Sequence, residues 1–388
     1  MIIRPLPPAF QGDMMILRAE LEYASGETRD LWYRFSASLK DRCTSSADPF
    51  MTAAVIHAMR LGEPVMVEGT VSPSLLWNLD RYMAAWNQWK PDLYKRVEVR
   101  AREEKESPAP ATDGVIMGFS GGIDSSFSAW QHAKKLAGRQ QLPLTAGVFV
   151  LGFDIPLGSE QGDYKSAFEK AKIMTDSIGI ELISVVTNFR ELDDWWEHAY
   201  PAGLASVEKL FQGYYAGGLI AGDSAQYNFN SAQIGFASNP FIDGWLGSRS
   251  FSVYHDGADK TRLDKVIAMK DWPEALKQMR ICWQGVQMDR NCCKCQKCIM
   301  TMLYYRLAGL PIPECFPIPL EDDDIRNVKY HDEATRGFNR KLINMAKERG
   351  ITESWVRALE DSLTVAPKET KPPVDDSQMM KILRRFLK

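Results

Sequence analysis

Long apolar runs and a strong net charge are both missing from this sequence. No stretch approaches the roughly 18 uninterrupted apolar residues that a membrane span requires, and the N-terminal residues lack the apolar region of a signal peptide. With 47 Lys and Arg against 50 Asp and Glu, the net charge is −3 and the isoelectric point about 6.1. These absences predict a cytoplasmic protein without a membrane span and argue against nucleic acid as a partner.

The cysteines do not have the dispersed spacing of a disulfide framework. Five of the seven lie between Cys282 and Cys298, and such clustering is typical of a metal site. The isolated Cys43 and Cys315 are expected to be buried thiols.

The length predicts more than one domain. A chain of 388 residues with 45% hydrophobic and 25% charged content has an ordinary globular composition and exceeds what one compact core usually fills. Residues 101–113 combine a charge run with two prolines, a composition that buries little apolar area and restricts helix formation. We therefore expect a small α+β accessory domain at residues 1–105, a second domain at residues 114–310 and a helical C-terminal extension at residues 311–388.

Apolar strands alternate with amphipathic helices in the second domain. Strand-like runs occupy residues 115–119, 144–151 and 181–186, and helices are expected to begin near residues 125, 163 and 207. Because this alternation is typical of parallel sheets covered on both faces, the predicted fold class is α/β with a doubly wound parallel sheet.

The flanking segments have simpler patterns. Residues 14–35 contain two strand-like runs around a turn, and Asp48-Pro49 opens a helix that ends near Gly62. Helical patterns cover residues 333–349 and 352–363. The basic amphipathic end, residues 379–388, could cap the sheet or bind a partner.

The most specific motif lies where the first strand of the second domain ends. Residues 114–126 read Gly-Val-Ile-Met-Gly-Phe-Ser-Gly-Gly-Ile-Asp-Ser-Ser, an apolar strand followed by a glycine turn and a helix. Glycines let successive N–H groups point inward, and the helix N-terminus adds unpaired amides and the positive end of its dipole. Asp124 could hold Mg²⁺, because that cation prefers carboxylate and phosphate oxygens. The predicted ATP-binding residues are Phe119, Ser120, Gly121, Gly122, Asp124, Ser125 and Ser126.

A glycine-rich turn after a strand is common in doubly wound sheets and does not by itself indicate a function. The six residues 120–125 taken together are a much more specific motif. The lysine of the G-x-x-x-x-G-K-[ST] loop is missing, which argues against γ-phosphoryl transfer. The six residues resemble the SGGxDS signature of the PP-loop, or N-type ATP pyrophosphatase, superfamily. That resemblance implies an adenine nucleotide alpha-hydrolase-like fold and attack of a substrate oxygen on the α-phosphate of ATP, with pyrophosphate leaving.

Four cysteines have the spacing of a metal site. Cys292, Cys295 and Cys298 form a C-x2-C-x2-C run, and Cys282 precedes this run. Four sulfurs with such spacings suit tetrahedral Zn²⁺ in a closed structural site, and an iron–sulfur cluster is the alternative occupant. Cys293 either occupies a turn position where glycine would also fit or is a thiol activated by the metal site.

The glycine loop and the cysteine spacing together resemble the 7-cyano-7-deazaguanine synthase family over roughly residues 114–310. Members of that family adenylate the carboxylate of 7-carboxy-7-deazaguanine, capture it with ammonia as an amide, and dehydrate the amide to a nitrile with further ATP. The resemblance implies an ATP-dependent C–N ligase that uses Mg²⁺, with Zn²⁺ held by Cys282, Cys292, Cys295 and Cys298.

Substrate contacts are expected beyond the carboxyl ends of the strands, where ligands bind in such sheets. Phe153 could stack on a base, and Asp154 could pair with a guanidine-like edge or with Mg²⁺. Lys260 or Arg262 could neutralise pyrophosphate charge. Asn188, after the third strand, is a further candidate. Each of these five residues could equally be part of the loop structure.

The sequence does not identify the nitrogen donor. The N-terminus offers no cysteine nucleophile of a glutaminase, so the amine is free ammonia or an amine of a partner. Relatives of the synthase in antiviral defence operons attach the deazaguanine to a protein amino terminus, and residues 1–105 could recruit such a protein acceptor. A homodimer is compatible with the sequence.

Two other functions remain as alternatives. PP-loop enzymes also adenylate carbonyl oxygens for attack by sulfur, so thiolation of a nucleobase or tRNA is one, and it requires a catalytic thiol such as Cys293 or Cys43. The other is a non-catalytic nucleotide-binding subunit. Release of pyrophosphate with a suitable substrate would separate an enzyme from such a subunit.

Overall fold

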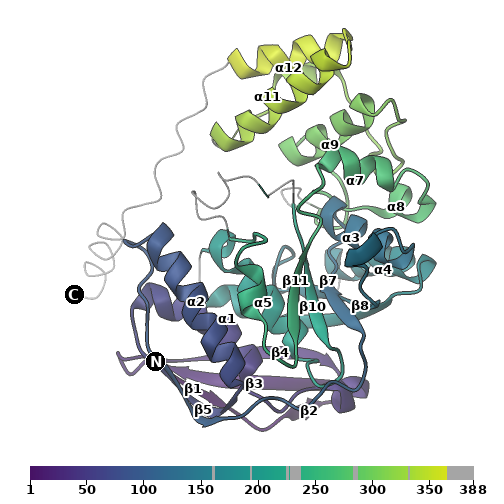
Figure 1. Ribbon diagram of the computed structural model, residues 1–388. Helices are drawn as coiled ribbons and strands as arrows, with labels where there is room; N and C mark the ends of the chain where they lie inside the picture. The colour runs from purple at the N-terminus through teal and green to yellow at the C-terminus, as the bar shows by residue number, and fades with distance from the viewer. Residues whose placement is uncertain are drawn as a thin grey trace. The chain divides into compact units, whose positions relative to one another are not determined.

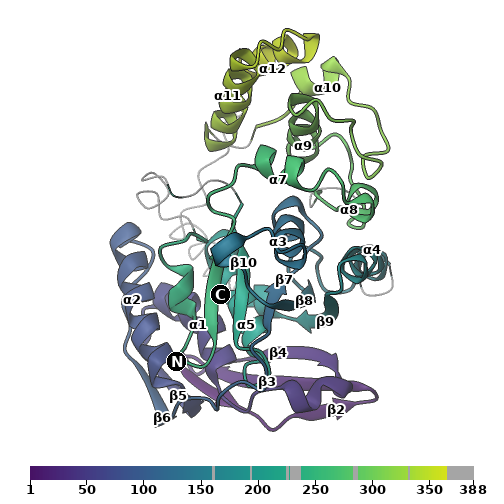
Figure 2. The ribbon, with the colours of Figure 1, turned by 45° about the vertical axis from the view of Figure 1, so that its right-hand side comes forward.

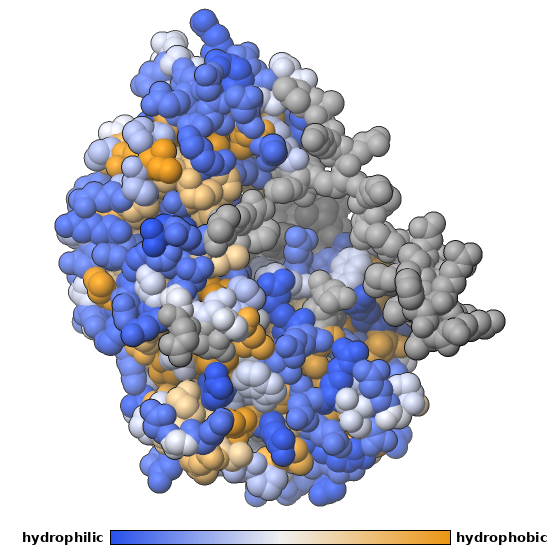
Figure 3. Space-filling model, turned by 180° about the vertical axis from the view of Figure 1, so that it is seen from behind, coloured by the Kyte–Doolittle hydropathy of each residue, from blue (hydrophilic) through white to orange (hydrophobic). Residues whose placement is uncertain are grey.

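The computed structural model describes residues 1–159, 162–192, 195–223, 227, 237–282, 287–330 and 333–364. Two compact units are found: residues 1–290 with 313–315, and residues 291–312 with 316–388. Among the described helices, none combines the length and apolar character that crossing a membrane requires. On the face drawn in Figure 3, hydrophilic residues predominate and hydrophobic residues form small, separate groups.

Parallel strands form the half of the sheet that carries the glycine loop (Figure 1). Their order is β11-β10-β7-β8-β9, and each neighbouring pair is parallel. Most of their residues are buried, as expected for apolar strands covered by helices on both faces. The five strands are β7 (Val115–Gly118), β8 (Leu144–Leu151), β9 (Glu181–Thr187), β10 (Gly217–Ala221) and β11 (Ser252–Asp256).

The strand order reverses beside β7. The next strand in the chain, β8, lies on one side of β7, whereas β10 lies on the other side. This reversal is the pattern of a doubly wound sheet, so the predicted α/β class is confirmed. Ligands of such sheets bind in the crevice at the reversal point, and the glycine loop follows β7 directly there.

Helices cover both faces of the parallel strands (Figures 1 and 2). Successive residues of a strand point to opposite faces of the sheet. In β11, two neighbouring residues contact helices on the two different faces. Asp256 accepts a hydrogen bond from Gln131 of α3 at 2.6 Å, whereas His255 contacts Asp243 of η4 at 2.7 Å. The helical elements of this unit that concern the site are α3 (Ile123–Ala133), α4 (Asp163–Ser177), α5 (Trp196–Lys209), η4 (Asp243–Leu246), α7 (Arg262–Ala268) and α8 (Pro273–Gln278).

The helix expected to begin near residue 207 is wrongly placed, because α5 begins at Trp196 and ends at Lys209. Pro201 lies inside α5 and weakens the helical signal of the sequence. Tertiary packing overrides this local preference. The glycine at 203 lets the helix approach the sheet so closely that a Cβ there would lie 2.6 Å from the ring of Phe189.

The N-terminal strands continue the same sheet. β4 pairs antiparallel with β9 through Tyr33–Thr187 and Arg34–Val186, which gives one sheet of 11 strands. The compact units of the structure therefore follow other boundaries than the three ranges expected from the sequence. The N-terminal strands are β1 (Ile2–Pro5), β2 (Ala9–Gln11), β3 (Met14–Glu22), β4 (Thr28–Ser36), β5 (Val65–Val71) and β6 (Val99–Glu104).

Local signals place the elements of this N-terminal part well. The hairpin predicted over residues 14–35 is confirmed as β3 and β4, which pair along their whole length. The helix predicted from Asp48-Pro49 to Gly62 is confirmed as α1 (Asp48–Leu61), with a proline in its first turn and Gly62 at a φ of 69° after its last. A second helix, α2 (Pro73–Trp89), also begins at a proline.

The second unit contains helices. The patterns over residues 333–349 and 352–363 are confirmed as α11 (Glu333–Glu348) and α12 (Ser354–Thr364). They are preceded by α9 (Gln296–Leu307) and α10 (Asp322–Arg326). The basic end predicted at residues 379–388 lies outside the described residues.

Candidate anion and metal sites

The glycine loop connects β7 to α3 at the point where the strand order reverses. Gly121 has a φ of 74°, a left-handed conformation that favours glycine. The Ser125 hydroxyl lies 3.3 Å from both the backbone nitrogen and the hydroxyl of Ser120, so it ties the turn together. No side chain of the described residues caps α3, so its first-turn amides are left to meet a ligand or water. The arrangement suits an anion.

The remaining predicted loop residues fix the turn rather than line its open side. Phe119 is buried, and its backbone N–H donates to Val148 of β8 at 2.9 Å. Ser126 is also buried, and its N–H donates to the Gly122 carbonyl at 3.0 Å. The loop therefore has a defined shape before any ligand binds.

Two cations of α7 meet the first turn of α3. Lys265 Nζ lies 2.8 Å from Asp124 Oδ1 and also donates to the carbonyl of Gly222, and Arg262 lies 3.2 Å from Asp124 Oδ2. Burial alone would raise the pKa of Asp124, but Arg262 and Lys265 together hold it below its usual range. Both carboxylate oxygens of Asp124 are thus engaged by cations, and its expected Mg²⁺ role stays a prediction.

A third cation lies on the β8 side of the loop. The backbone N–H of Arg280 donates to the Gly121 carbonyl at 2.9 Å. Its guanidinium is 6% exposed, donates to the carbonyl of Cys282 at 3.3 Å, and lies 3.9 Å from Asp154. The buried Nε has no hydrogen-bond partner in the described part of the chain. Burial lowers the pKa of Arg280, while Asp154 opposes that shift.

The predicted substrate residues fall into two groups. The structure brings Arg262 to the loop through Asp124, and Asp154 through Arg280. Lys260 instead pairs with Asp259 at 2.7 Å and is 43% exposed, and no contact among the described residues joins it to the loop.

Phe153 and Asn188 serve the packing of the sheet. The Phe153 ring is 8% exposed and lies 4.8 Å from the ring of Trp196, centroid to centroid. The Asn188 amide accepts from Trp32 N at 3.0 Å and donates to Asp30 O at 2.7 Å, which fastens β4 to the end of β9. Their side chains are therefore occupied by protein contacts.

Reasoning from the sequence missed Lys265, Arg280, Asp223 and His255. Lys265 lies one turn after Arg262 on the same helix, so helical spacing was an available signal. Asp223 lies two residues after β10, at the edge where ligands bind. Its pKa is raised by burial and by Asp124, against the opposing effect of Arg262. For Arg280 the sequence offered no signal, because its position depends on tertiary contacts.

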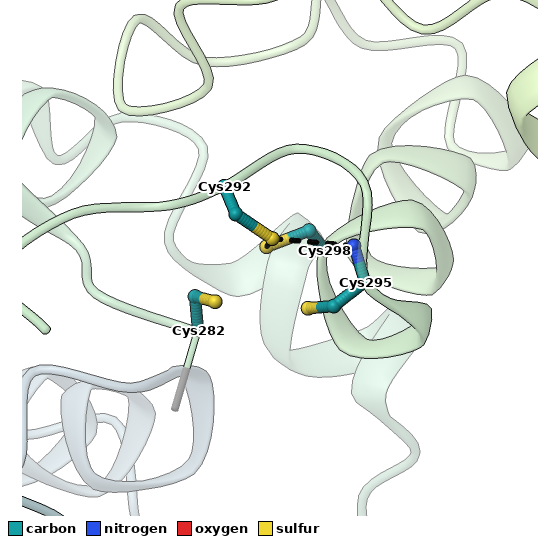
Figure 4. A group of neighbouring side chains, drawn as sticks. All are labelled: Cys282, Cys292, Cys295 and Cys298. Atoms are coloured by element: carbon teal, nitrogen blue, oxygen red, sulfur yellow. Dashed lines mark hydrogen bonds between the residues drawn. The ribbon is translucent and has the colours of Figure 1, made fainter. Parts of the chain in front are cut away.

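Four cysteine sulfurs converge in the structure (Figure 4). The Sγ atoms of Cys282, Cys292, Cys295 and Cys298 all lie within 4.8 Å of one another. The Sγ atoms of Cys292 and Cys298 are 3.9 Å apart, close to the roughly 3.8 Å that Zn–S bonds of about 2.3 Å give in a tetrahedron. The backbone N–H of Cys295 points at Cys292 Sγ at 3.2 Å. The group could hold a metal ion such as zinc.

Cys315 is buried as expected, whereas Cys43 is only partly buried. Cys293 has a φ of 58°, a conformation that favours glycine, and its side chain is fully buried. Its Sγ contacts the carbonyl of Asn291 at 3.7 Å. Burial raises the pKa of Cys43 to about 12, and its Sγ donates to Leu39 O at 3.2 Å. Neither thiol has the exposed, cationic surroundings of a reactive one.

Comparison with models of known protein families, with curated proteins and with solved structures gives no match to this chain.

Proposed function

We propose that the loop at residues 119–126 binds the phosphates of ATP and that the chain transfers AMP to a substrate carboxylate with release of pyrophosphate. One observation carries this proposal: an uncapped helix N-terminus behind a glycine turn lies at the reversal point of the strand order, with cations on both sides of it. Arg262 and Lys265 lie on the β10 side, and Arg280 on the β8 side. Three cations around one loop match a polyanionic ligand.

The two sides of the loop suit different parts of the reaction. Amides of the first turn of α3, with Arg262 beside them, would hold the leaving pyrophosphate, and charge that develops there is stabilised by fixed donors. Arg280 would hold the substrate carboxylate, since its planar fork matches a carboxylate and its Nε has no protein acceptor among the described residues. The half-exposed Asp154 beside it would accept from an N–H of the substrate. Mg²⁺, when bound, would neutralise phosphate charge, with Asp124 or Asp223 as its nearest carboxylates.

The substrate is proposed from the joint resemblance of the loop and the cysteine spacing, which favours 7-carboxy-7-deazaguanine or a related base. Ammonia or a primary amine, including the amino terminus of a protein acceptor in a defence system, would then attack the activated carboxyl. Sulfur transfer is disfavoured because Cys293 is fully buried and burial raises the pKa of Cys43 to about 12. An amide or a nitrile is therefore the expected product class.

The test is direct. The full chain is incubated with ATP, Mg²⁺ and 7-carboxy-7-deazaguanine, with and without ammonium, and AMP, pyrophosphate and new masses are measured. AMP and pyrophosphate formed in equal amounts, with an amide mass only when ammonium is present, would support the proposal. If no AMP forms with this acid or with a panel of other heterocyclic acids, the proposed adenylation is wrong, and the alternative of a non-catalytic nucleotide-binding subunit is favoured.

We also propose that the four-cysteine group is a closed zinc site that stabilises the chain around it rather than taking part in the reaction. All four ligand positions are filled by sulfur, which leaves no open position for substrate. Metal analysis of the purified protein should give about one zinc per chain, and the double variant C295S/C298S should lose it. Iron and acid-labile sulfide in place of zinc would contradict this assignment.

A further inference from the structure

A second polar group lies at the carboxyl end of β11, outside the roles proposed above. His255 Nδ1 is 2.7 Å from Asp243 Oδ2, and the two side chains are 3% and 0% exposed. The Ser238 hydroxyl also donates to Asp243 Oδ2 at 2.7 Å, and the Asn239 N–H donates to Oδ1 at 3.2 Å. Asp243 is therefore fixed by several donors and in turn fixes the imidazole.

The hydrogen bond to Asp243 determines which nitrogen of His255 carries the proton. A carboxylate accepts, so Nδ1 carries the hydrogen and donates it, and Nε2 of the neutral ring has a lone pair. His255 Nε2 is buried and has no hydrogen-bond partner in the part of the chain that the structure describes. A buried polar atom without a partner costs free energy, so a purely structural histidine would be expected to satisfy it.

Asp223 links His255 electrostatically to the glycine loop. It interacts with His255 and also with Asp124, Arg262 and Lys265. Tyr200 of α5 hydrogen-bonds to Ser238, and burial raises its pKa well above the ordinary value. The titratable groups that interact with His255 are Asp243 of η4, at 2.7 Å, and Asp223, two residues after β10. Tyr200 and the two cations of α7 interact with Asp223 in turn.

The chain contains a second buried histidine for comparison. His132 of α3 lies 3.3 Å from Asp256, and its Nδ1 accepts from the Leu142 N–H at 3.2 Å. Like His255 Nε2, His132 Nε2 is buried without a hydrogen bond among the described residues, but it has a carboxylate oxygen of Asp256 at 3.3 Å. His255 differs because the carboxylate contact is on Nδ1 and no ion pair or hydrogen bond is found for Nε2 among the described residues.

We propose that His255, oriented by Asp243, is the general base that accepts the proton of the nitrogen nucleophile. This inference rests on the proposed adenylation of a carboxylate. The amine nitrogen attacks the carbonyl carbon of the acyl adenylate and forms the C–N bond, and the C–O bond to phosphate breaks with its electron pair leaving on AMP. The proton lost from nitrogen goes to His255 Nε2, and the imidazolium later releases it to water. The nucleophile class is ammonia or a primary amine.

The experiment separates the two half-reactions in wild type, H255Q and the control H132Q. ATP–pyrophosphate exchange with 7-carboxy-7-deazaguanine measures adenylation, and amide formation measures transfer. In H255Q we expect exchange to stay within about twofold of wild type, and amide formation to fall by roughly 10²- to 10⁴-fold. H132Q removes a buried histidine of the same kind and should transfer at the wild-type rate.

Two amine probes distinguish the sources of nitrogen: ammonium chloride, and a short peptide with a free amino terminus. If H255Q loses solubility, D243N takes its place, because an amide cannot hold the same imidazole tautomer and transfer should again fall while exchange persists. The inference is overturned if H255Q forms amide at the wild-type rate, or if exchange and transfer fall together. Absence of exchange in wild type overturns the proposed function itself, and this inference with it.

Discussion

Two carboxylates, the buried Asp48 and the 22% exposed Asp124, show what distinguishes a structural polar group from a site. Asp48 of α1 is fully buried and accepts from Ser72 N at 2.8 Å, from Ser72 Oγ at 2.7 Å and from Gln212 Nε2 at 3.0 Å. Asp124 meets two cations instead, at 2.8 and 3.2 Å, beside an uncapped helix N-terminus. Neutral donors make the hydrogen bonds to Asp48, and the buried Lys209 interacts with it only electrostatically. Asp124 instead pairs directly with two cations, where backbone amides remain open.

Other buried polar side chains of the sheet can be compared in the same way. Asn188, at the junction of the two halves, has its amide bonded to main-chain groups of residues 30 and 32. In the parallel half, Arg280 Nε and His255 Nε2 are buried without a partner among the described residues, and so are Thr52 Oγ1, Tyr82 OH and Trp86 Nε1 in the N-terminal part. An unsatisfied buried atom therefore does not mark a site by itself. What distinguishes Arg280 and His255 is their place, because the Arg280 N–H donates to the glycine loop and His255 lies at the carboxyl end of β11, where ligands of such sheets bind.

The isosteric variants D124N and D48N test the difference between the two carboxylates. Of the two, D124N should have the larger effect on activity. Loss of the Asp124 charge releases Arg262 and Lys265 from their fixed positions, and ATP–pyrophosphate exchange should fall by about 10²- to 10³-fold. Exchange kinetics at saturating ATP measure this. If D124N exchanges pyrophosphate at the wild-type rate, Arg262 and Lys265 do not need Asp124 to hold them in place.

The matched change D48N should act on stability instead. Replacing a carboxylate oxygen by an amide NH₂ turns one of the accepting positions into a donor and breaks part of the Ser72 and Gln212 network. We expect the free energy of unfolding to fall by about 2 kcal/mol in urea titrations, with exchange unchanged. A loss of exchange without a loss of stability would place Asp48 in the site.

A smaller effect is expected from R280K, with R42K as its control. Lys cannot reproduce the planar fork, so the KM for the carboxylic acid should rise about tenfold while kcat changes little. Arg42 also makes a charged hydrogen bond, to Glu181 at 2.6 Å. Glu181 is the first residue of β9, so this pair lies at the end of the strand opposite to the ligand-binding edge. R42K should leave KM and kcat unchanged. A rise in KM in R42K as well would show that the effect of R280K is not specific to the proposed carboxylate contact.

The smallest effect is a dependence of stability on pH. The pKa of Asp124 is held below its usual range in the folded state, so its ion pairs contribute stability above the unfolded pKa, and that contribution is lost as pH falls through the lowered value. Between about pH 5 and pH 3, wild type should lose more unfolding free energy than D124N, and the two curves should converge. Parallel curves in urea titrations across this range would contradict the ion pairing.

Much of the local structure followed from the sequence. The apolar runs and the proline and glycine signals predicted β8, α1 and the β3–β4 hairpin, because those signals act between neighbouring residues. The start of α5 was predicted too late in the chain, and Pro201 inside this helix shows that packing outweighs a local preference there. The antiparallel pairing of β4 with β9 joins residues more than 150 positions apart, and no local pattern encodes it.

For the site, the sequence by itself determined the glycine loop and the cysteine spacing, because both are short motifs whose geometry depends on consecutive residues. Only the tertiary structure decided which distant side chains surround the loop. It brought Arg262, Lys265 and Arg280 to the loop, left Lys260 on the surface, and set His255 against Asp243 with one nitrogen unpaired among the described residues. Charge and burial at a point in space depend on how strands and helices pack, and spacing along the chain does not specify that packing.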